Sequence, residues 1–279
     1  TSKSDRKLLD ANTEKLYQVF ISPIEDLLEG KKNIAMVPTG EMYKVPLQAL
    51  GKMEDGKMNY LISSYDITYI TNTRQADATG KIDVKGLIFG NPDKTLANAE
   101  KEANEIVAIF PGSTVFVRDS ATEDKAKNMM VRFNVVHFAT HGRLDPIEFK
   151  NSYLVMAPNT SSGDDGKLTM AEITGFKTLG PIKLLVLSAC DMAVKNEKKE
   201  GWVNTPVHAF IKKGVGTAVA PLWKVHDEAT SLLMIEFYNN LLGGMGISEA
   251  LKNSQLKLAQ NEKFSHPYYW SAFETVGKW

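Results

Sequence analysis

The sequence lacks the residues for several common kinds of site. Its 279 residues include a single cysteine, which excludes an intrachain disulfide framework and any zinc or iron–sulfur centre built on several thiolates. Lys and Arg together number 33, and so do Asp and Glu, so the formal net charge is zero. A neutral chain argues against bulk electrostatic binding to nucleic acid or to an anionic membrane. No apolar run approaches the roughly 18 residues that a membrane-spanning helix needs.

Sequence motifs for nucleotide binding and for serine hydrolases are also missing. The chain contains no Walker A, GxGxxG or GxSxG pattern, so nucleotide binding and serine hydrolase chemistry have no motif to support them. The first ten residues contain no apolar segment of the kind found in a signal peptide. Because the single thiol also suits a reducing compartment, we expect a cytoplasmic protein.

The chain does have the composition of a globular protein. Hydrophobic residues make up 43% and charged residues 24%, so it can bury a sizeable core and is not expected to be disordered. Strands are expected at 84–90, 114–117, 134–140, 153–157, 182–188, 217–222 and 273–276, and helices at 96–110, 121–131, 228–242 and 247–258. This alternation predicts an α/β fold, an open and mostly parallel sheet with helices on both faces.

The first part of the chain is predicted to form its own α/β unit. Helices are expected at 12–20 and 23–28, and strands at 34–37, 60–63 and 67–70. The polar, turn-rich stretch 71–83 is the best candidate boundary. We therefore expect an amino-terminal α/β part in residues 1–80 and a larger part in residues 81–279.

Two helix starts have the spacing of a capping box. In this motif the N-cap hydroxyl and a Glu three residues later each bond the backbone of the other. Ser120 and Glu123 have this spacing, and Thr169 and Glu172 repeat it. The pattern predicts that one helix begins after Ser120 and another after Thr169.

Two predicted strands end in residues suited to nucleophilic catalysis. In open α/β sheets, reactive groups gather beyond the carboxyl ends of the strands. One strand leads into Thr140-His141-Gly142 and another into Cys190. A nearby imidazole favours the thiolate, which is the nucleophilic form of cysteine, and the backbone N–H groups of Gly142 and Cys190 could hold an oxyanion. The sequence reveals no third residue that would orient His141.

These residues also have purely structural interpretations. Free cysteine is commonly a small buried hydrophobe, and Cys190 could be one. His137 precedes His141 in the segment HFATH, but the zinc motif of metalloproteases needs a helix and a Glu after the first His, where this chain has Phe138. We therefore expect no metal site, and we interpret His137 as a core histidine on its strand.

The segment after the strand at 217–222 offers candidate substrate contacts. Trp223 could form the wall of a peptide-binding cleft, or it could pack in the core. Asp227 could receive a basic side chain, although its position also suits the N-cap of the following helix.

Four segments together resemble the CHAT domain, the caspase-like domain often found with tetratricopeptide repeats. They are 136–142, 185–190, 222–227 and 266–270 with Phe273. Their order around the segment DDGKLTMAEI at 164–173 also resembles caspases, and Leu-Trp-x-Val-x-Asp is similar to separases. The earlier segments 34–40 and 45–50 are also similar to the amino-terminal part of these domains, so the resemblance covers nearly the whole chain.

The resemblance implies a caspase-like cysteine endopeptidase that needs no cofactor. It assigns Cys190 as the nucleophile, His141 rather than His137 as the general base and acid, and the N–H groups of Gly142 and Cys190 as the oxyanion hole. Members of the family are typically activated by attached domains. The expected partners are therefore a protein substrate and a regulatory sensor or tetratricopeptide-repeat domain, in cis or in trans, as part of a signalling system.

The sequence departs from the family pattern close to the thiol. Asp191 fits the acidic residue expected after the cysteine, whereas Met192 stands where Thr is expected. Basic-specific relatives often carry an acidic residue two positions before the cysteine, where this chain has Ser188. Asp227 is then the acidic candidate for binding Arg or Lys at P1, and an apolar P1 residue is the alternative. The candidate substrate-binding residues are Trp223, Asp227, Asp191 and Ser188.

Two functions other than proteolysis are alternatives. One is a caspase-like scaffold that binds protein partners without catalysis, which the reactivity of Cys190 toward an alkylating probe would distinguish from the enzyme. The other is nucleotide binding by the sheet, which the missing glycine-rich motif disfavours.

Overall fold

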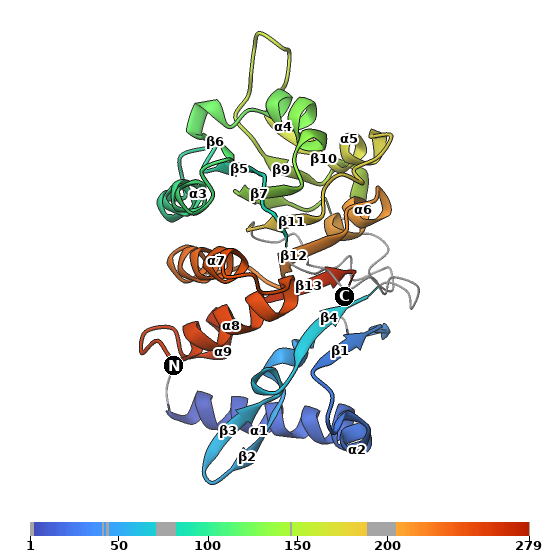
Figure 1. The fold of residues 1–279 in the computed structure, drawn as a ribbon, viewed down its shortest axis with the longest axis vertical. Helices are drawn as coiled ribbons and strands as arrows, with labels where there is room; N and C mark the ends of the chain where they lie inside the picture. Colours follow the sequence, from blue (N-terminus) through green and yellow to red (C-terminus); the bar gives the residue numbers. More distant parts are fainter. Residues whose placement is uncertain are drawn as a thin grey trace.

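An eight-stranded sheet forms the centre of the protein (Figure 1). The computed structural model describes residues 3–40, 42, 45–70, 82–145, 147–188 and 205–278. The strand order is β1-β4-β13-β12-β11-β7-β5-β6. The strands are β1 (Asn33–Met36), β4 (Asp66–Tyr69), β13 (Phe273–Gly277), β12 (Thr217–Pro221), β11 (Leu184–Leu187), β7 (Val135–Ala139), β5 (Gly86–Gly90) and β6 (Thr114–Val117).

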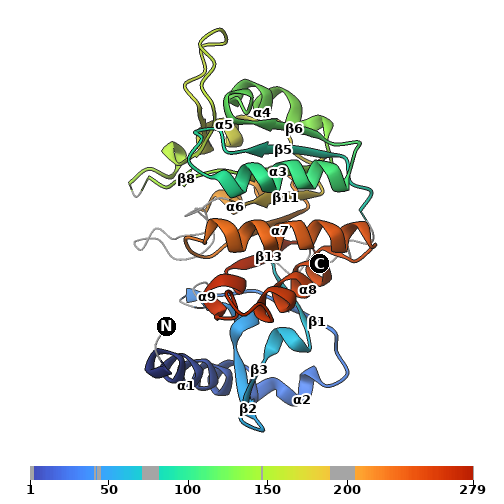
Figure 2. The same cartoon turned by 90° about the vertical axis from the view of Figure 1, so that its left-hand side faces the viewer.

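Helices cover both faces of this sheet. One face carries α3 (Ala97–Ile109), α7 (Asp227–Leu242) and α8 (Ile247–Ala259), which lie toward the viewer in Figure 2. The opposite face carries α4 (Glu123–Met129), α5 (Met170–Gly175) and α6 (Pro206–Lys212). At the amino-terminal end of the molecule lie α1 (Lys3–Phe20) and α2 (Glu25–Leu28). The predicted α/β fold, a mostly parallel sheet flanked by helices, is confirmed.

The central strands are apolar because they are buried on both sides. Every residue of β7 and of β11 is buried, as expected for parallel strands covered by two helix layers. Along β7 the side chains alternate between the layers. Val136 and Phe138 join the core beneath α4, α5 and α6, while Val135 joins the core beneath α3, α7 and α8.

The direction of the sheet reverses at β13. This strand pairs antiparallel with β12 and parallel with β4. The other pairings in the sheet are parallel. The carboxyl ends of β5, β7, β11 and β12 therefore share one edge of the sheet with the amino-terminal end of β13. We call this edge the catalytic edge.

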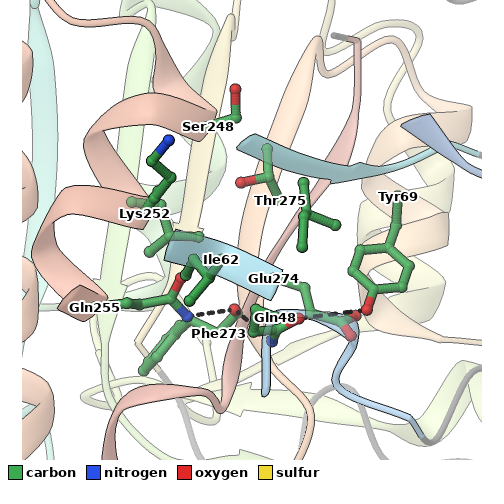
Figure 3. Close-up of a pocket in the computed structure, with 11 residues that line it drawn as sticks. Gln48, Ile62, Tyr69, Ser248, Lys252, Gln255, Phe273, Glu274 and Thr275 are labelled. Atoms are coloured by element: carbon green, nitrogen blue, oxygen red, sulfur yellow. Dashed lines mark hydrogen bonds between the residues drawn. The ribbon is translucent and has the colours of Figure 1, made fainter. Parts of the chain in front are cut away.

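Two glutamine side chains line a pocket beside the point where the pairing of β13 with β4 ends (Figure 3). The two strands pair over only two residues. Just before this pairing, Nε2 of the buried Gln48 donates to the carbonyl oxygens of Ser271 at 2.6 Å and Phe273 at 3.2 Å. Nε2 of Gln255 on α8 also donates to the Phe273 carbonyl, at 3.0 Å. Since buried carbonyl groups need hydrogen-bond donors, these amides stabilise the join where the strand pairing ends.

Two smaller sheets lie outside the central one. β2 (Gly51–Glu54) and β3 (Lys57–Tyr60) form a hairpin near α1, and β8 (Gly142–Arg143), β9 (Tyr153–Val155) and β10 (Lys167–Thr169) form an antiparallel sheet. The predicted strand at 60–63 is wrong, because β3 ends at Tyr60 and Leu61–Ser63 is a 3-10 turn. Leu61 and Ile62 are both buried, and a short apolar run does not distinguish a strand from a buried turn.

Only one of the two predicted capping boxes forms. Thr169 caps α5, since its Oγ1 accepts from the Glu172 N–H at 3.2 Å and its own N–H donates to the Glu172 carboxylate at 2.8 Å. The prediction at Ser120 is wrong, because α4 begins at Glu123 with Thr122 as the N-cap. The Glu123 carboxylate instead accepts hydrogen bonds from a loop that is distant in sequence.

A buried polar cluster lies between β7, α3 and α7. His137 is fully buried on β7, which confirms it as a core histidine. Its Nε2 lies 2.8 Å from Oε1 of Glu102 on α3, and its Nδ1 lies 3.1 Å from the hydroxyl of Tyr238 on α7. Burial, with a smaller contribution from the Glu102 charge, raises the pKa of Tyr238 well above its ordinary value. Tyr238 therefore stays protonated, and its hydroxyl can donate to the imidazole.

We expect Glu102→Ala to lower the free energy of unfolding by about 1 to 3 kcal/mol, because the buried imidazole loses its polar neighbour. Glu102→Gln keeps an acceptor for His137 and is expected to cost less. Urea denaturation followed by circular dichroism measures both changes. Wild-type stability in Glu102→Ala would contradict the assignment of the cluster as a stabilising pair.

Candidate active site

The strands that lead to the two predicted catalytic residues are neighbours. β7 and β11 pair in parallel, with Phe138 beside Leu187. The chain reaches His141 three residues after Phe138, at the catalytic edge. Ser188 follows β11 directly and is buried. Cys190 and Asp191 lie outside the described residues.

Two side chains from the loop after β5 lie beside one nitrogen of the His141 ring. Nε2 of His141 lies 2.7 Å from Oγ1 of Thr95 and 3.8 Å from Oδ2 of Asp93. The Thr95 hydroxyl donates to Oδ1 of Asp93 at 2.8 Å. The His141 side chain is 18% exposed, so it remains accessible at the edge.

The loop is held in place by Asn91, the buried residue that follows β5. Asn91 has a φ of 50°, a left-handed conformation that Asn tolerates better than most residues. Its N–H donates to the Ala139 carbonyl at the end of β7, at 2.9 Å, and its Oδ1 accepts from the Leu96 N–H at 2.8 Å. The loop that carries Asp93 and Thr95 is thereby tied to the strand that carries His141.

The sequence motifs do not predict the contact between this loop and His141. One signal for it was present, because the loop begins at the carboxyl end of a predicted parallel strand, where polar side chains gather. The signal does not say which strands are neighbours. β5 lies beside β7, and only this placement brings Thr95 to the imidazole.

Gly142, the predicted oxyanion-hole residue, belongs to the small sheet at the catalytic edge. It is buried and pairs with Leu154 of β9. The carbonyl of His141 accepts from the Val155 N–H at 2.8 Å. The backbone that follows the imidazole is therefore fixed by pairing with β9.

Trp223 forms an aromatic pair with Tyr268 one strand further along the catalytic edge. Trp223 follows β12 and donates from Nε1 to the Tyr268 carbonyl at 3.1 Å. The two rings stack with centroids 6.3 Å apart. Tyr268, on the short helix α9 (Pro267–Trp270) that precedes β13, is 44% exposed. The pair therefore presents partly exposed aromatic surface at this edge.

Asp227 lies at the start of α7 and is already hydrogen-bonded. Its Oδ2 accepts from the backbone N–H of Asn98 at 3.1 Å and from the Asn98 side chain at 2.8 Å, which links α7 to α3. The N-cap of α7 is His226, whose Nδ1 accepts from the Ala229 N–H at 3.4 Å. The N-cap interpretation of Asp227 is therefore wrong by one residue.

The segment 164–173 is tied to α4 through one lysine. Nζ of Lys127 lies 2.9 Å from Glu123, 2.5 Å from Asp164 and 3.1 Å from Glu172. Partial burial disfavours the ammonium form of Lys127, but the three carboxylates outweigh it and raise its pKa above the ordinary value. The Lys127 ammonium in turn lowers the pKa of Asp164. The cluster thus holds the β9–β10 hairpin against α4.

We expect Lys127→Met to lower the free energy of unfolding by about 1 to 3 kcal/mol at pH 7, because three neighbouring carboxylates lose their shared cation. The pKa values of Asp164 and Glu172 are lowered, whereas burial raises that of Glu123. The stability that Asp164 and Glu172 contribute is present above their unfolded pKa values and is lost as the pH falls through the folded ones. The difference from wild type should therefore shrink at about pH 3, near or below the ordinary carboxyl pKa values.

Lys150→Met is the matched control, since its ion pair with Glu148 has side chains that are 66% and 52% exposed. A change within about 0.5 kcal/mol is expected for this surface pair. If both variants lose the same stability at pH 7, the cluster around Lys127 has no special role.

Among the described residues there is no group of three or more His, Cys, Asp or Glu side chains placed to hold a metal ion. His137 is committed to the core pair with Glu102, so it is not presented beside His141 as a ligand. Within the same part of the chain, no helix has both the length and the apolar character to cross a membrane.

The sequence matches one protein-family model along almost its whole length. The CHAT domain model aligns with residues 10–278, so this chain belongs to the CHAT domain family. Curated relatives include tetratricopeptide repeat protein 28 of Mus musculus, 22% identical, and of Homo sapiens, 23% identical. Each alignment covers 94% of this chain but only 13% of the relative, so the chain spans about an eighth of the length of these proteins.

Solved structures of two kinds share the fold. Separase in the Saccharomyces cerevisiae separase–securin complex has a TM-score of 0.59 and 14% identity, with 85% of this chain and 15% of that one covered. The Arg-specific cysteine proteinase gingipain R has a TM-score of 0.60 and 8% identity, with 98% and 73% covered. A second gingipain structure, the Porphyromonas gingivalis complex of RgpB pro- and mature domains, has a TM-score of 0.59 and 9% identity, with 94% and 70% covered. The caspase-like fold of this chain is therefore established.

Proposed function

We propose that this protein is a cysteine endopeptidase with Cys190 as the nucleophile and His141 as the general base and acid. The observation that carries the proposal is the parallel pairing of β7 with β11. The segment that leads to His141 and the segment that leads to Cys190 therefore begin side by side at the catalytic edge. Membership of the CHAT family and the caspase-like fold support the same reaction class.

The reaction consists of two acyl-transfer steps. The Cys190 thiol gives its proton to His141, and the thiolate attacks the scissile carbonyl carbon. The oxyanion that forms is held by the N–H groups of Gly142 and Cys190. As the C–N bond breaks, the imidazolium returns the proton to the leaving amine, and a thioester remains. Water then attacks the thioester with His141 as base, which releases the acid and regenerates the thiol.

The aromatic pair at the catalytic edge supports an apolar rather than a basic P1 preference. The Asp227 carboxylate already accepts two hydrogen bonds from Asn98, and a basic substrate side chain would have to compete with them. The partly exposed Trp223 and Tyr268 offer an aromatic wall for a peptide. Ser188 is buried and directly follows β11, two residues before Cys190. Ser188 and Asp191 are the other two proposed substrate-binding residues.

Control by another domain is part of the proposal. The curated relatives are named for tetratricopeptide repeats, and one structural neighbour is described in complex with securin. We infer that a sensor or tetratricopeptide-repeat domain, in cis or in trans, regulates cleavage of a protein substrate by this chain.

Cys190→Ala and His141→Ala are each expected to lower cleavage of a peptide library by about a thousandfold or more, because nucleophile and base act as a unit. His208→Ala is the control, since this half-buried histidine lies on α6 and outside the proposed machinery. Library cleavage is measured by mass spectrometry with the purified protein, alone and with its native flanking domains. Undiminished cleavage by Cys190→Ala would show that the nucleophile is wrongly assigned.

A peptide-based alkylating probe separates the enzyme from a catalytically silent scaffold. The enzyme should be labelled at Cys190, and labelling should be lost in His141→Ala but kept in His208→Ala. Labelling that is equally slow in all three proteins would favour the scaffold.

Trp223→Ala is expected to raise KM for a preferred peptide by about tenfold while kcat changes by less than about threefold, because the lost aromatic contact stabilises substrate and transition state alike. Trp223→Phe keeps an aromatic ring and should recover most of the affinity. Steady-state kinetics on one peptide measures both constants. A wild-type KM in Trp223→Ala would remove this residue from the substrate site.

A further inference from the structure

The hydrogen bonds around His141 define where its ring proton lies. The Thr95 hydroxyl has one hydrogen, and an ionised carboxylate such as Asp93 can only accept. Because the hydroxyl donates to Asp93 at 2.8 Å, the Thr95 oxygen is left as an acceptor toward the imidazole nitrogen 2.7 Å away. Nε2 of His141 must then carry a hydrogen. In the neutral ring, Nδ1 is therefore the unprotonated nitrogen.

We propose that Thr95 and Asp93 are positioning residues that hold His141 as the Nε2–H tautomer. This inference rests on the proposed cysteine endopeptidase function and adds the identity of the reacting nitrogen. Nδ1 is the atom that takes the proton from the Cys190 thiol and later gives it to the leaving amine. The Nε2–H bond to Thr95 stays intact through both transfers, so one proton moves and none is gained or lost.

The chain holds this arrangement through backbone bonds rather than through side-chain packing alone. Besides its hydroxyl bond, Thr95 donates its N–H to Oδ1 of Asp93 at 3.2 Å. Asn91 connects the same loop to the end of β7 through the Ala139 carbonyl. The donor, the acceptor and the histidine are therefore linked by hydrogen bonds, which restricts both the tautomer and the orientation of the ring.

Asp93 also contributes to the charge balance at the ring. Its Oδ2 lies 3.8 Å from Nε2 of His141, so its charge can attract the positive charge that the ring takes up when it accepts the thiol proton. The neighbouring Lys94 is paired with Asp119 at 2.8 Å, so its ammonium is directed toward another carboxylate. Asp93 is thus the carboxylate placed to stabilise the protonated ring that forms when the thiol is deprotonated.

The tautomer is tested by ¹⁵N NMR of the full chain labelled at histidine, in a Cys190→Ala background so that no turnover is needed. His141→Gln identifies the His141 resonances by their absence. The Nε2–H tautomer is expected in this background and with Thr95→Ser, which keeps the hydroxyl. Thr95→Val removes the acceptor, and Asp93→Ala frees the hydroxyl hydrogen, so both should give a mixture of tautomers. An Nδ1–H ring in the starting protein, or no change in Thr95→Val, would overturn the proposal.

Kinetics supply a second readout that a merely structural role would not produce. Thr95→Val is expected to lower kcat by about five- to tenfold and to change KM by less than about twofold. This loss of rate corresponds to the free energy of one hydrogen bond to the reacting group. Thr95→Ser should restore kcat to within about threefold of wild type. Thr174→Val is the matched control, since that hydroxyl donates to backbone carbonyls of its own helix, α5. An equal loss in Thr174→Val would contradict a specific role for Thr95.

Different results would reject the endopeptidase mechanism and the positioning role of Thr95. Cleavage that survives Cys190→Ala rejects the endopeptidase mechanism, whatever Thr95→Val does. An inactive Cys190→Ala together with wild-type tautomer and kcat in Thr95→Val rejects only the positioning role. If no peptide is cleaved, the NMR experiment still decides the tautomer.

Discussion

The parallel pairing of β7 with β11 is the interaction on which the candidate site depends. Phe138 lies beside Leu187 in this pair, and both residues are fully buried. Because successive side chains point to opposite faces, a slip of one residue would move each of them into the wrong helix layer. His141 therefore takes its position from the core. The loop with Thr95 takes its own position from β5, on the other side of β7.

The sequence predicted those parts of the site that follow buried strands. The apolar runs ending near His141 and Ser188 identify parallel strands, and the ends of such strands share an edge. Thr95 and Asp93 could not be predicted in the same way. Their approach to the imidazole depends on the left-handed conformation of Asn91 and on its bond to the end of β7, which no local pattern encodes.

Two carboxylates serve contacts between elements rather than the local roles that their spacing indicates. Glu123 has the spacing of a capping box but accepts hydrogen bonds from the backbone of Gly166 and Lys167. Asp227 stands near a helix start but binds Asn98 of another helix. A capping motif describes one turn of one helix. It cannot show that a carboxylate finds donors on a segment distant in sequence, so tertiary contacts decide both positions.

The place of β13 within the sheet has a consequence for how the chain folds. β13 is formed by Phe273–Gly277, yet it lies between β12 and β4 rather than at an edge. Among the described strands, β1 and β4 therefore join the other five through β13, which follows all of them in the sequence. Such pairing between segments distant in sequence is slow to form. On the ribosome, β1 and β4 must wait for residues 273–277, and so must the completed catalytic edge, where α9 and its aromatic residues precede β13.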